Sequence, residues 1–203
     1  MKKIKLSIIF LMIFSYSKGQ NLSYGPILGF NAYDISIGGP INDGAGYSGL
    51  NFGGFLEHQF NSSFGVRGNI IYNNIKEGKH YVVTGNQITS YLFDKAEIQS
   101  LQIQTLLKYD VNKDYNKGFY IIGGFRMSNI LNVKLDGQKN EDFYKRESFG
   151  AMLGFGVNFA KHFGLELIPE INLTNPINSK INKSRNIGGY LNLTLNLESI
   201  IKK

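Results

Sequence analysis

Few side chains in this sequence could perform covalent chemistry, and they are far apart. The three histidines are His58, His80 and His162, and the chain has no cysteine. A serine hydrolase needs a histidine beside its nucleophile and a carboxylate that orients the imidazole. Only His80 has such groups in the same polar segment, namely Glu77, Ser90 and Asp94. Because a long loop positions such groups poorly without support, we predict no catalytic residues and no enzymatic activity.

Residues 44–49, Gly-Ala-Gly-Tyr-Ser-Gly, satisfy the G-x-G-x-x-G pattern of dinucleotide-binding folds. In those folds the motif opens a helix whose N-terminus receives the pyrophosphate. Here a segment with a two-residue period follows instead. We therefore predict a glycine-rich loop and no cofactor.

A second motif resembles the start of a calcium-binding loop, with oxygen ligands at Asp110, Asn112, Asp114 and Asn116. The calcium loop also needs a glycine at its sixth position and a bidentate glutamate at its twelfth. Tyr115 and Ile121 occupy those two positions. The segment is better explained as a solvated turn, so we predict no metal site.

The elements that must carry these residues are β-strands. In residues 64–73, Phe64, Val66 and Ile70 share one parity, and Arg67 and Asn69 share the other. This two-residue period is typical of a strand with one apolar and one polar face. Similar segments, some blurred by glycine, predict eight strands at 24–33, 50–60, 64–73, 101–109, 119–130, 149–159, 163–171 and 191–198.

The connections between these strands alternate in length. Short ones cover residues 61–63, 110–118 and 161–162, and long polar ones cover 36–47, 75–96, 131–146 and 173–183. Outer-membrane barrels have short periplasmic turns and long external loops. The sequence thus predicts an all-β fold, an eight-stranded antiparallel up-and-down transmembrane β-barrel, with both termini in the periplasm.

Aromatic residues bracket the three short turns. In membrane barrels such rings form a girdle at the level of the lipid headgroups. A soluble barrel of the lipocalin type is the alternative, but it would place its apolar residues inside and its charges outside. We predict a periplasmic girdle made of Phe60, Phe64, Tyr109, Phe119, Phe159 and Phe163.

The opposite parity collects charges of both signs, with amides such as Asn69 and Gln104 between them. Eight strands leave an interior just wide enough for side chains to fill. A packed polar core is therefore expected, and a narrow porin-like channel is the alternative. The predicted lumenal charge network, with a structural role, consists of Glu57, Arg67, Lys108, Arg126, Glu166, Glu170 and Glu198.

Composition indicates one exported domain. Residues 1–19 resemble a signal peptide, with lysines at positions 2, 3 and 5, an apolar run over 6–16 and small residues before Gln20. Their removal takes away four lysines and no acid, which lowers the formal charge from +7 to +3. The charge therefore gives no reason to expect nucleic acid as a partner. Residues 20–203 form the predicted barrel domain, and no later stretch is apolar and long enough for a membrane helix.

The long loops are rich in lysine and arginine. On an outer surface these cations could pair with lipopolysaccharide phosphates, although a solvated surface with interspersed acids is the preferred explanation. Aromatic groups at 81–83, 91–93 and 143–144 could mark contact with an unknown protein partner. The cations are Lys76, Lys79, Lys134, Lys139, Lys145, Arg146, Lys180, Lys183 and Arg185.

Three segments carry a resemblance to a known family: 51–57 (Asn-Phe-Gly-Gly-Phe-Leu-Glu), 64–67 (Phe-Gly-Val-Arg), and 101–109 (Leu-x-Ile-x-x-Leu-Leu-Lys-Tyr) followed by Gly118-Phe119-Tyr120. With these the chain resembles the PorT-like, or porin-like, outer membrane β-barrel domain family of Gram-negative bacteria. The resemblance implies an integral outer-membrane barrel inserted by the barrel-assembly machinery. It supplies no catalytic residues, and a few such proteins take part in protein secretion.

We therefore expect a non-enzymatic barrel that acts structurally, as a scaffold, or by binding through its loops. A narrow channel is the first alternative. A barrel enzyme acting on lipid or peptide is the second.

Overall fold

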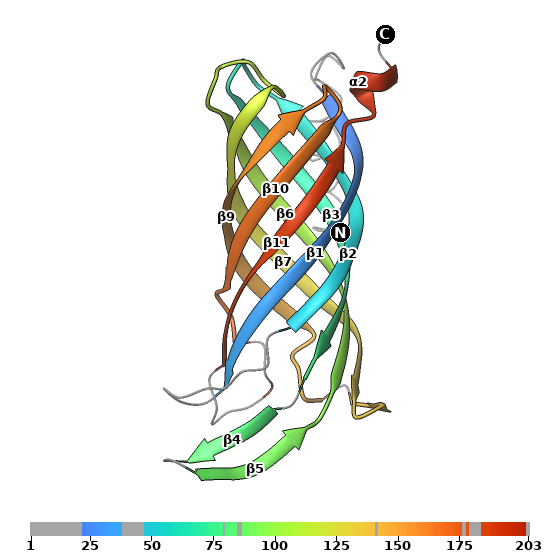
Figure 1. Cartoon of the computed structure of the whole chain (residues 1–203), viewed down its shortest axis with the longest axis vertical. Helices are drawn as coiled ribbons and strands as arrows, with labels where there is room; N and C mark the ends of the chain where they lie inside the picture. Colours follow the sequence, from blue (N-terminus) through green and yellow to red (C-terminus); the bar gives the residue numbers. More distant parts are fainter. Residues whose placement is uncertain are drawn as a thin grey trace, which may run out of the picture.

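The computed structural model describes residues 22–37, 47–78, 80–84, 87–140, 142–175, 178 and 184–201. The predicted signal peptide at residues 1–19 and the glycine-rich motif at 44–49, apart from 47–49, lie outside them. Eight long strands build the molecule (Figure 1): β1 (Leu22–Ile37), β2 (Tyr47–Gln59), β3 (Phe64–Glu77), β6 (Ala96–Asp110), β7 (Gly118–Leu135), β9 (Glu147–Phe159), β10 (Phe163–Asn172) and β11 (Ser184–Leu195).

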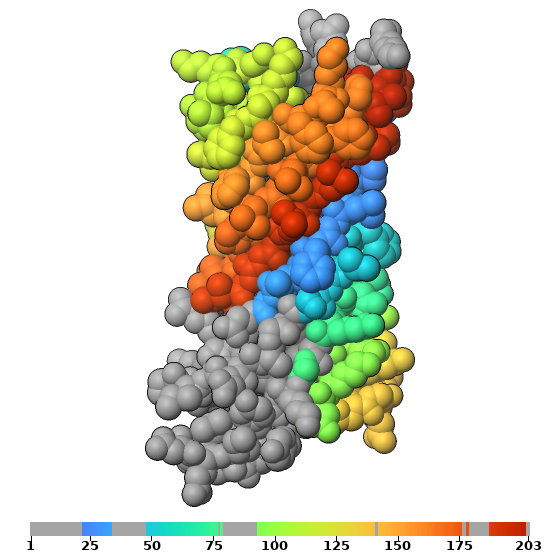
Figure 2. All heavy atoms as spheres, in the orientation of Figure 1, coloured from blue at the N-terminus to red at the C-terminus, as the bar shows by residue number. Residues whose placement is uncertain are grey.

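Antiparallel pairing closes these strands into a barrel, as predicted. Their order is β6-β3-β2-β1-β11-β10-β9-β7, and β6 also pairs with β7. Strands that follow one another in the barrel wall are therefore consecutive in the sequence, and the first and last strands, β1 and β11, pair with each other. In Figure 2 the wall made by β10, β11, β1 and β2 is continuous, with side chains in slanting ridges. No helix among the described residues is long and apolar enough to cross a membrane.

The two-residue period has the predicted orientation. Along β6 buried and exposed residues alternate, with Leu107 64% exposed and Lys108 fully buried. The same holds for β10, where Leu165 and Leu167 point outward and Glu166 points inward. Over most of its height the outer surface of these strands is thus an apolar band, and the charged side chains at that level point into the interior.

The strands are longer than predicted at the end opposite the short turns. The segment 75–96, expected as a loop, contains the end of β3, a hairpin of β4 (His80–Thr84) and β5 (Gln87–Phe93), and the start of β6. β7 continues to Leu135 and pairs with β8 (Gln138–Lys139). Backbone pairing needs no apolar side chains, so hydrogen-bonded strands extend beyond the apolar band with polar residues on their outer face.

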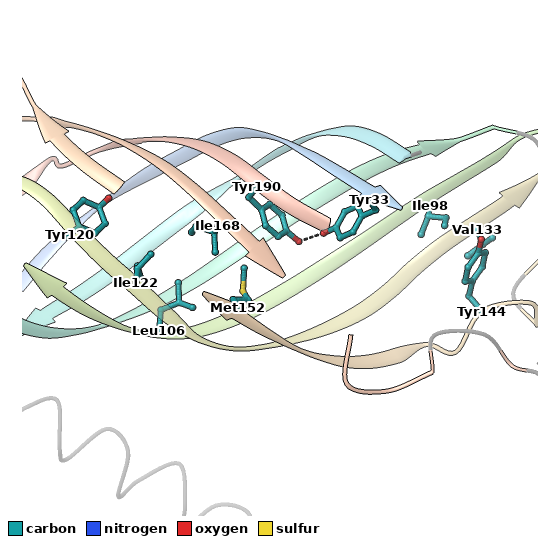
Figure 3. Close-up of a cluster of buried hydrophobic side chains, with 10 residues drawn as sticks. All are labelled: Tyr33, Ile98, Leu106, Tyr120, Ile122, Val133, Tyr144, Met152, Ile168 and Tyr190. Atoms are coloured by element: carbon teal, nitrogen blue, oxygen red, sulfur yellow. Dashed lines mark hydrogen bonds between the residues drawn. The ribbon is translucent and has the colours of Figure 1, made fainter. Parts of the chain in front are cut away.

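The buried apolar cluster of the barrel continues into the extended β6–β7 hairpin. Val133 and Tyr144 are buried together with Ile98 at one end of this cluster, beyond Tyr33 (Figure 3). Phe143 packs edge-on against Phe93, with ring centroids 5.6 Å apart. These contacts fold the segment between β7 and β9 against the inner side of the extension.

The last strand begins and ends earlier than predicted, at Ser184 and Leu195 rather than at 191 and 198. β11 ends at Leu195, which pairs with Phe163, the first residue of β10. β10 therefore offers no partner for later residues, and the chain forms the short helix α2 (Glu198–Ile201) instead.

One glycine makes the packing of the interior possible. A Cβ atom placed on Gly156 would overlap the ring of Tyr120, whereas a Cβ on Gly68 would meet nothing within 4 Å. We expect Gly156→Ala to lower the free energy of unfolding by about 1–3 kcal/mol, because the overpacked tyrosine must shift. Urea-induced unfolding in phospholipid vesicles measures this, with Gly68→Ala as the matched control. Equal stability of the two variants would refute the packing argument.

Candidate functional site

The interior of the barrel is the site that the sequence singled out, and an ion bridge crosses it. Glu57 on β2 and Arg67 on β3 are directly opposite in the register. Arg67 Nε donates to Glu57 Oε2 at 2.6 Å, and its Nη1 donates to Glu166 Oε1 on β10. β3 and β10 are four strands apart in either direction around the barrel. The guanidinium therefore joins opposite walls, and all three residues are buried.

Lys108 on β6 adds a second cation beside this bridge. Its ammonium donates to Glu57 Oε1 at 3.2 Å and to Asn116 Oδ1 at 2.5 Å, and it lies 3.7 Å from Asp110. The Tyr115 and Tyr120 rings lie 4.5 and 4.4 Å from the ammonium nitrogen. Buried charges are tolerated when they are paired and hydrogen-bonded. Lys108, Glu57 and Arg67 meet both conditions, whereas Asp110 is paired with Lys108 without a hydrogen bond to its carboxylate among the described residues.

Tyr120 on β7 fills the space between the charges. Its hydroxyl donates to Glu166 Oε1 at 2.6 Å, and its ring lies 5.9 Å from the Arg67 guanidinium. On the other side of Arg67 the Phe55 ring is 4.9 Å away. The guanidinium is thus held between aromatic rings as well as carboxylates, which leaves it little freedom to move.

A second ion pair lies nearer the long-loop end. Arg126 on β7 donates through Nε to Glu170 Oε2 on β10 at 2.6 Å. It also donates to Asn172 Oδ1 and, at 3.4 Å, to Ser148 Oγ. Every donor nitrogen of this buried arginine therefore has a partner among the described residues.

Between the two ion clusters, tyrosines and apolar side chains close the lumen (Figure 3). The hydroxyls of Tyr33 and Tyr190 are hydrogen-bonded, and Tyr190 donates to Gln102 Oε1 at 2.7 Å. β11 and β6 are also four strands apart, so this bond is a second crossing of the interior. Leu106, Ile122, Met152 and Ile168 pack between Tyr120 and this crossing. The interior is thus less polar than predicted.

The lumen opens at the short-turn end. There a vestibule of about 580 Å³ is lined by residues that include Ser23, Tyr115 and Asn116. Beneath it, beside Glu57 and Arg67, the free space falls to about 10 Å³. That is room for about one water molecule. Burial and the Glu57 carboxylate raise the pKa of the Tyr115 hydroxyl, which keeps this turn residue neutral at the floor of the vestibule.

At the rim of the vestibule, His162 contacts a serine. His162 Nδ1 lies 2.7 Å from Ser199 Oγ, and Ser199 Oγ donates to the Asn196 carbonyl at 2.7 Å. A hydroxyl has one proton, so in this arrangement Ser199 accepts from the histidine and is not activated as a nucleophile. The contact fastens α2 to the turn between β9 and β10.

The structure brings six of the seven predicted lumenal charges inside the barrel, in two separate clusters. Glu198 is the exception and requires a correction: it lies in α2, beyond the end of β11, and lines the vestibule. The prediction missed Asp110, Tyr120 and Tyr190, which are fully buried. Asp110 and Tyr120 have the inward parity of Lys108 and Ile122, so the period of their strands could have identified them.

The six aromatic residues of the predicted girdle lie at the short-turn end, on the outer face. Phe64 pairs with Tyr109 and Phe163 with Phe159 in the register, with ring centroids 4.8 and 5.9 Å apart. Phe60 and Phe119 are exposed on the same face.

Of the alternative enzymatic site, the side chains of Glu77, His80 and Ser90 lie outside the described part. The described residues contain no group of three or more His, Asp or Glu that could hold a metal ion.

Residues 15–178 match the family described as "Outer membrane protein beta-barrel domain". The chain belongs to this family. No curated protein matches it. The protein is thus an outer-membrane β-barrel of the Gram-negative type, which agrees with its apolar outer surface and closed sheet.

Solved structures with the same fold include two bacterial surface proteins. Ail, the attachment invasion locus protein of Yersinia pestis, is 13% identical, with a TM-score of 0.50. Its complex with the heparin analogue sucrose octasulfate gives a TM-score of 0.51. Neisserial surface protein A is 14% identical, with a TM-score of 0.54. Each match covers 87% of this chain and 99% of the other, and identities this low show the fold alone.

Removal of Arg67 should strongly destabilise the barrel. Glu57 would keep Lys108, but Glu166 would remain buried with only the Tyr120 hydroxyl. We expect Arg67→Met to reduce the free energy of unfolding in vesicles by about 3–5 kcal/mol. The same change at exposed Lys117, which pairs with Asp114 at 3.0 Å, should cost less than about 1 kcal/mol.

A double variant, Arg67→Met with Glu166→Gln, separates lost charge pairing from lost packing, because Glu57 keeps its pair with Lys108. Since the buried carboxylate that lost its partner is now neutral, this variant should regain most of the stability that the single variant loses. A double variant as unstable as Arg67→Met would contradict the electrostatic explanation.

Proposed function

We propose that this protein is a non-enzymatic, non-conducting outer-membrane barrel that acts as a scaffold and presents its long-loop end to a partner. The observation that carries the proposal is the bridge of Glu57, Arg67 and Glu166 across the lumen. A channel needs a continuous polar path, whereas here charged and aromatic side chains fill the cross-section. In this proposal the interior side chains stabilise the barrel, and partners bind to its outer surfaces.

We infer that the short-turn end faces the periplasm and the long-loop end faces outward. The aromatic girdle at the short-turn end and the extended hairpins at the other support this orientation, which is usual for such barrels. In this orientation the vestibule opens to the periplasm, and the β6–β7 extension projects from the cell.

The extension is suited to hold a partner-binding surface in place. Its side chains Phe93, Ile98, Val133 and Tyr144 form an ordered core, so the segments around it are supported by packing. Outer-membrane lipid is the proposed partner of the apolar band, and the barrel-assembly machinery is the proposed partner during insertion. The motifs at 51–57 and 101–109 further support a place among PorT-like barrels, some of which serve protein secretion.

The purified barrel should show no steady conductance in planar lipid bilayers. Arg67→Ala combined with Tyr120→Ala removes one ion bridge and one ring, but the Tyr33–Tyr190 crossing and the apolar side chains packed beside it remain, so this variant should not conduct either. Different gel migration of boiled and unboiled samples verifies that each preparation is folded. Steady conductance of the unaltered barrel would reject the closed scaffold and favour a narrow channel.

Single cysteines can test the orientation cleanly, because the natural chain has none. Asp142→Cys, in the exposed segment between β7 and β9, should react with a membrane-impermeant maleimide on intact cells. Lys113→Cys, in the exposed turn between β6 and β7, should react only after the outer membrane is permeabilised. The reverse pattern would show that the barrel is inserted the other way.

A further inference from the structure

A row of charged residues crosses three neighbouring strands on the outer wall, at the long-loop end. Lys76 on β3 is opposite Glu97 on β6, and Glu97 is opposite Lys134 on β7. All three have the outward parity of their strands, and both lysines are exposed. With strands about 4.8 Å apart, the two lysine backbones are separated by about 10 Å. Two flexible lysine side chains can converge across such a distance.

The height of this row on the wall is fixed by the residues beneath it. On β3 the outward side chains run from Ile70 through Tyr72 and Asn74 to Lys76. On β6 they run from Ile103 and Leu101 through Gln99 to Glu97. Outward positions are about 6.6 Å apart along a strand. The charged row therefore begins two positions beyond the last apolar ring, with one row of amides between them: Asn74, Gln99 and Asn132.

The row carries an excess of positive charge. Besides Lys76 and Lys134, Lys95 contacts Glu97 with 2.9 Å between Nζ and Oε1. The Glu97 carboxylate interacts electrostatically with all three lysines. The Asp136 carboxylate lies beside Lys95, because its Oδ1 accepts from the Lys95 amide at 2.8 Å. Within the row itself, the exposed lysines Lys76 and Lys134 flank one carboxylate, so the row has a net positive charge at the edge of the apolar band.

We propose that Lys76, Lys134 and Lys95 form a site on the outer barrel wall for the phosphate groups of the phosphorylated glycolipid of the outer leaflet. The chains of such a lipid would lie on the apolar residues of β3, β6 and β7. Its phosphates would then meet the lysines, since the amide row spans the polar boundary between them. A zwitterionic phospholipid has its own ammonium group and gains less from a positively charged row.

This site rests on the proposed orientation but not on the closed lumen. Glu97 distinguishes this site from non-specific binding of anionic lipid, because Glu97 competes with lipid phosphate for the same lysines. Its neutralisation should strengthen binding, whereas loss of the lysines should weaken it.

The test uses the folded, full-length barrel in detergent micelles and native mass spectrometry to count bound lipid A. Near a membrane surface each lysine contributes about fivefold to affinity for anionic lipid. We expect Lys76→Gln with Lys134→Gln to weaken lipid A binding by about twenty- to thirtyfold. Glu97→Gln should strengthen it by about fivefold. The matched control is Lys113→Gln with Lys117→Gln at the short-turn end, which should change nothing.

Two further probes identify the source of the phosphate. Dephosphorylated lipid A should bind the unaltered barrel as weakly as lipid A binds the double variant. Inorganic phosphate alone, at the same concentration, should not displace lipid A. Unchanged binding in the double variant, equal loss in the control pair, or displacement by free phosphate would each overturn the site. Conductance is measured separately, so a conducting barrel with intact lipid A binding would reject the closed scaffold and leave this site standing.

Discussion

Pairing between β6 and β7, together with that between β1 and β11, leaves no unpaired edge in the sheet, and the other features of the molecule follow from this closure. Backbone N–H and C=O groups that face hydrocarbon have no water to bond, so a sheet can lie in a membrane only when it is closed. Closure with eight strands also fixes the width of the interior. The outside must then be apolar, and the inside must be filled by side chains.

The interior of the barrel is filled in part by buried side chains with charges of both signs. Arg67 suits its position because a guanidinium can bond two carboxylates on different walls at once, which an ammonium group does with less defined geometry. Lys108 is instead placed where three oxygen atoms and two aromatic rings surround a compact cation. Since one removed partner would leave a buried charge, the networks constrain which strands can face one another. This is a role in specifying the fold, separate from any role in binding.

The two ends of the barrel present different surfaces. At the short-turn end, compact turns surround a polar vestibule whose floor is sealed by Tyr115, Asn116 and the charged cluster. At the long-loop end, paired strands continue past the apolar band, and the buried apolar cluster of the barrel extends between them. There the outer wall changes from apolar to amide to charged residues within a few positions. The surfaces available to partners are therefore outside the lumen, on the extension and along its wall.

The sequence alone determined the eight barrel strands and their faces, because the parity of a side chain is a local property of an extended backbone. It did not determine how far the strands extend or that β4, β5 and β8 form beyond them. It also placed the girdle residues and six lumenal charges on the correct sides. Only the tertiary structure decided that Arg67 meets Glu166 from the opposite wall, because that contact depends on closure and on the stagger of the strands. Likewise Glu198 has suitable parity in the sequence, but β10 has no residue left to pair there, so the chain turns into α2. The sequence of each strand shows which charged side chains point inward. The geometry of the closed barrel decides which of these side chains contact one another.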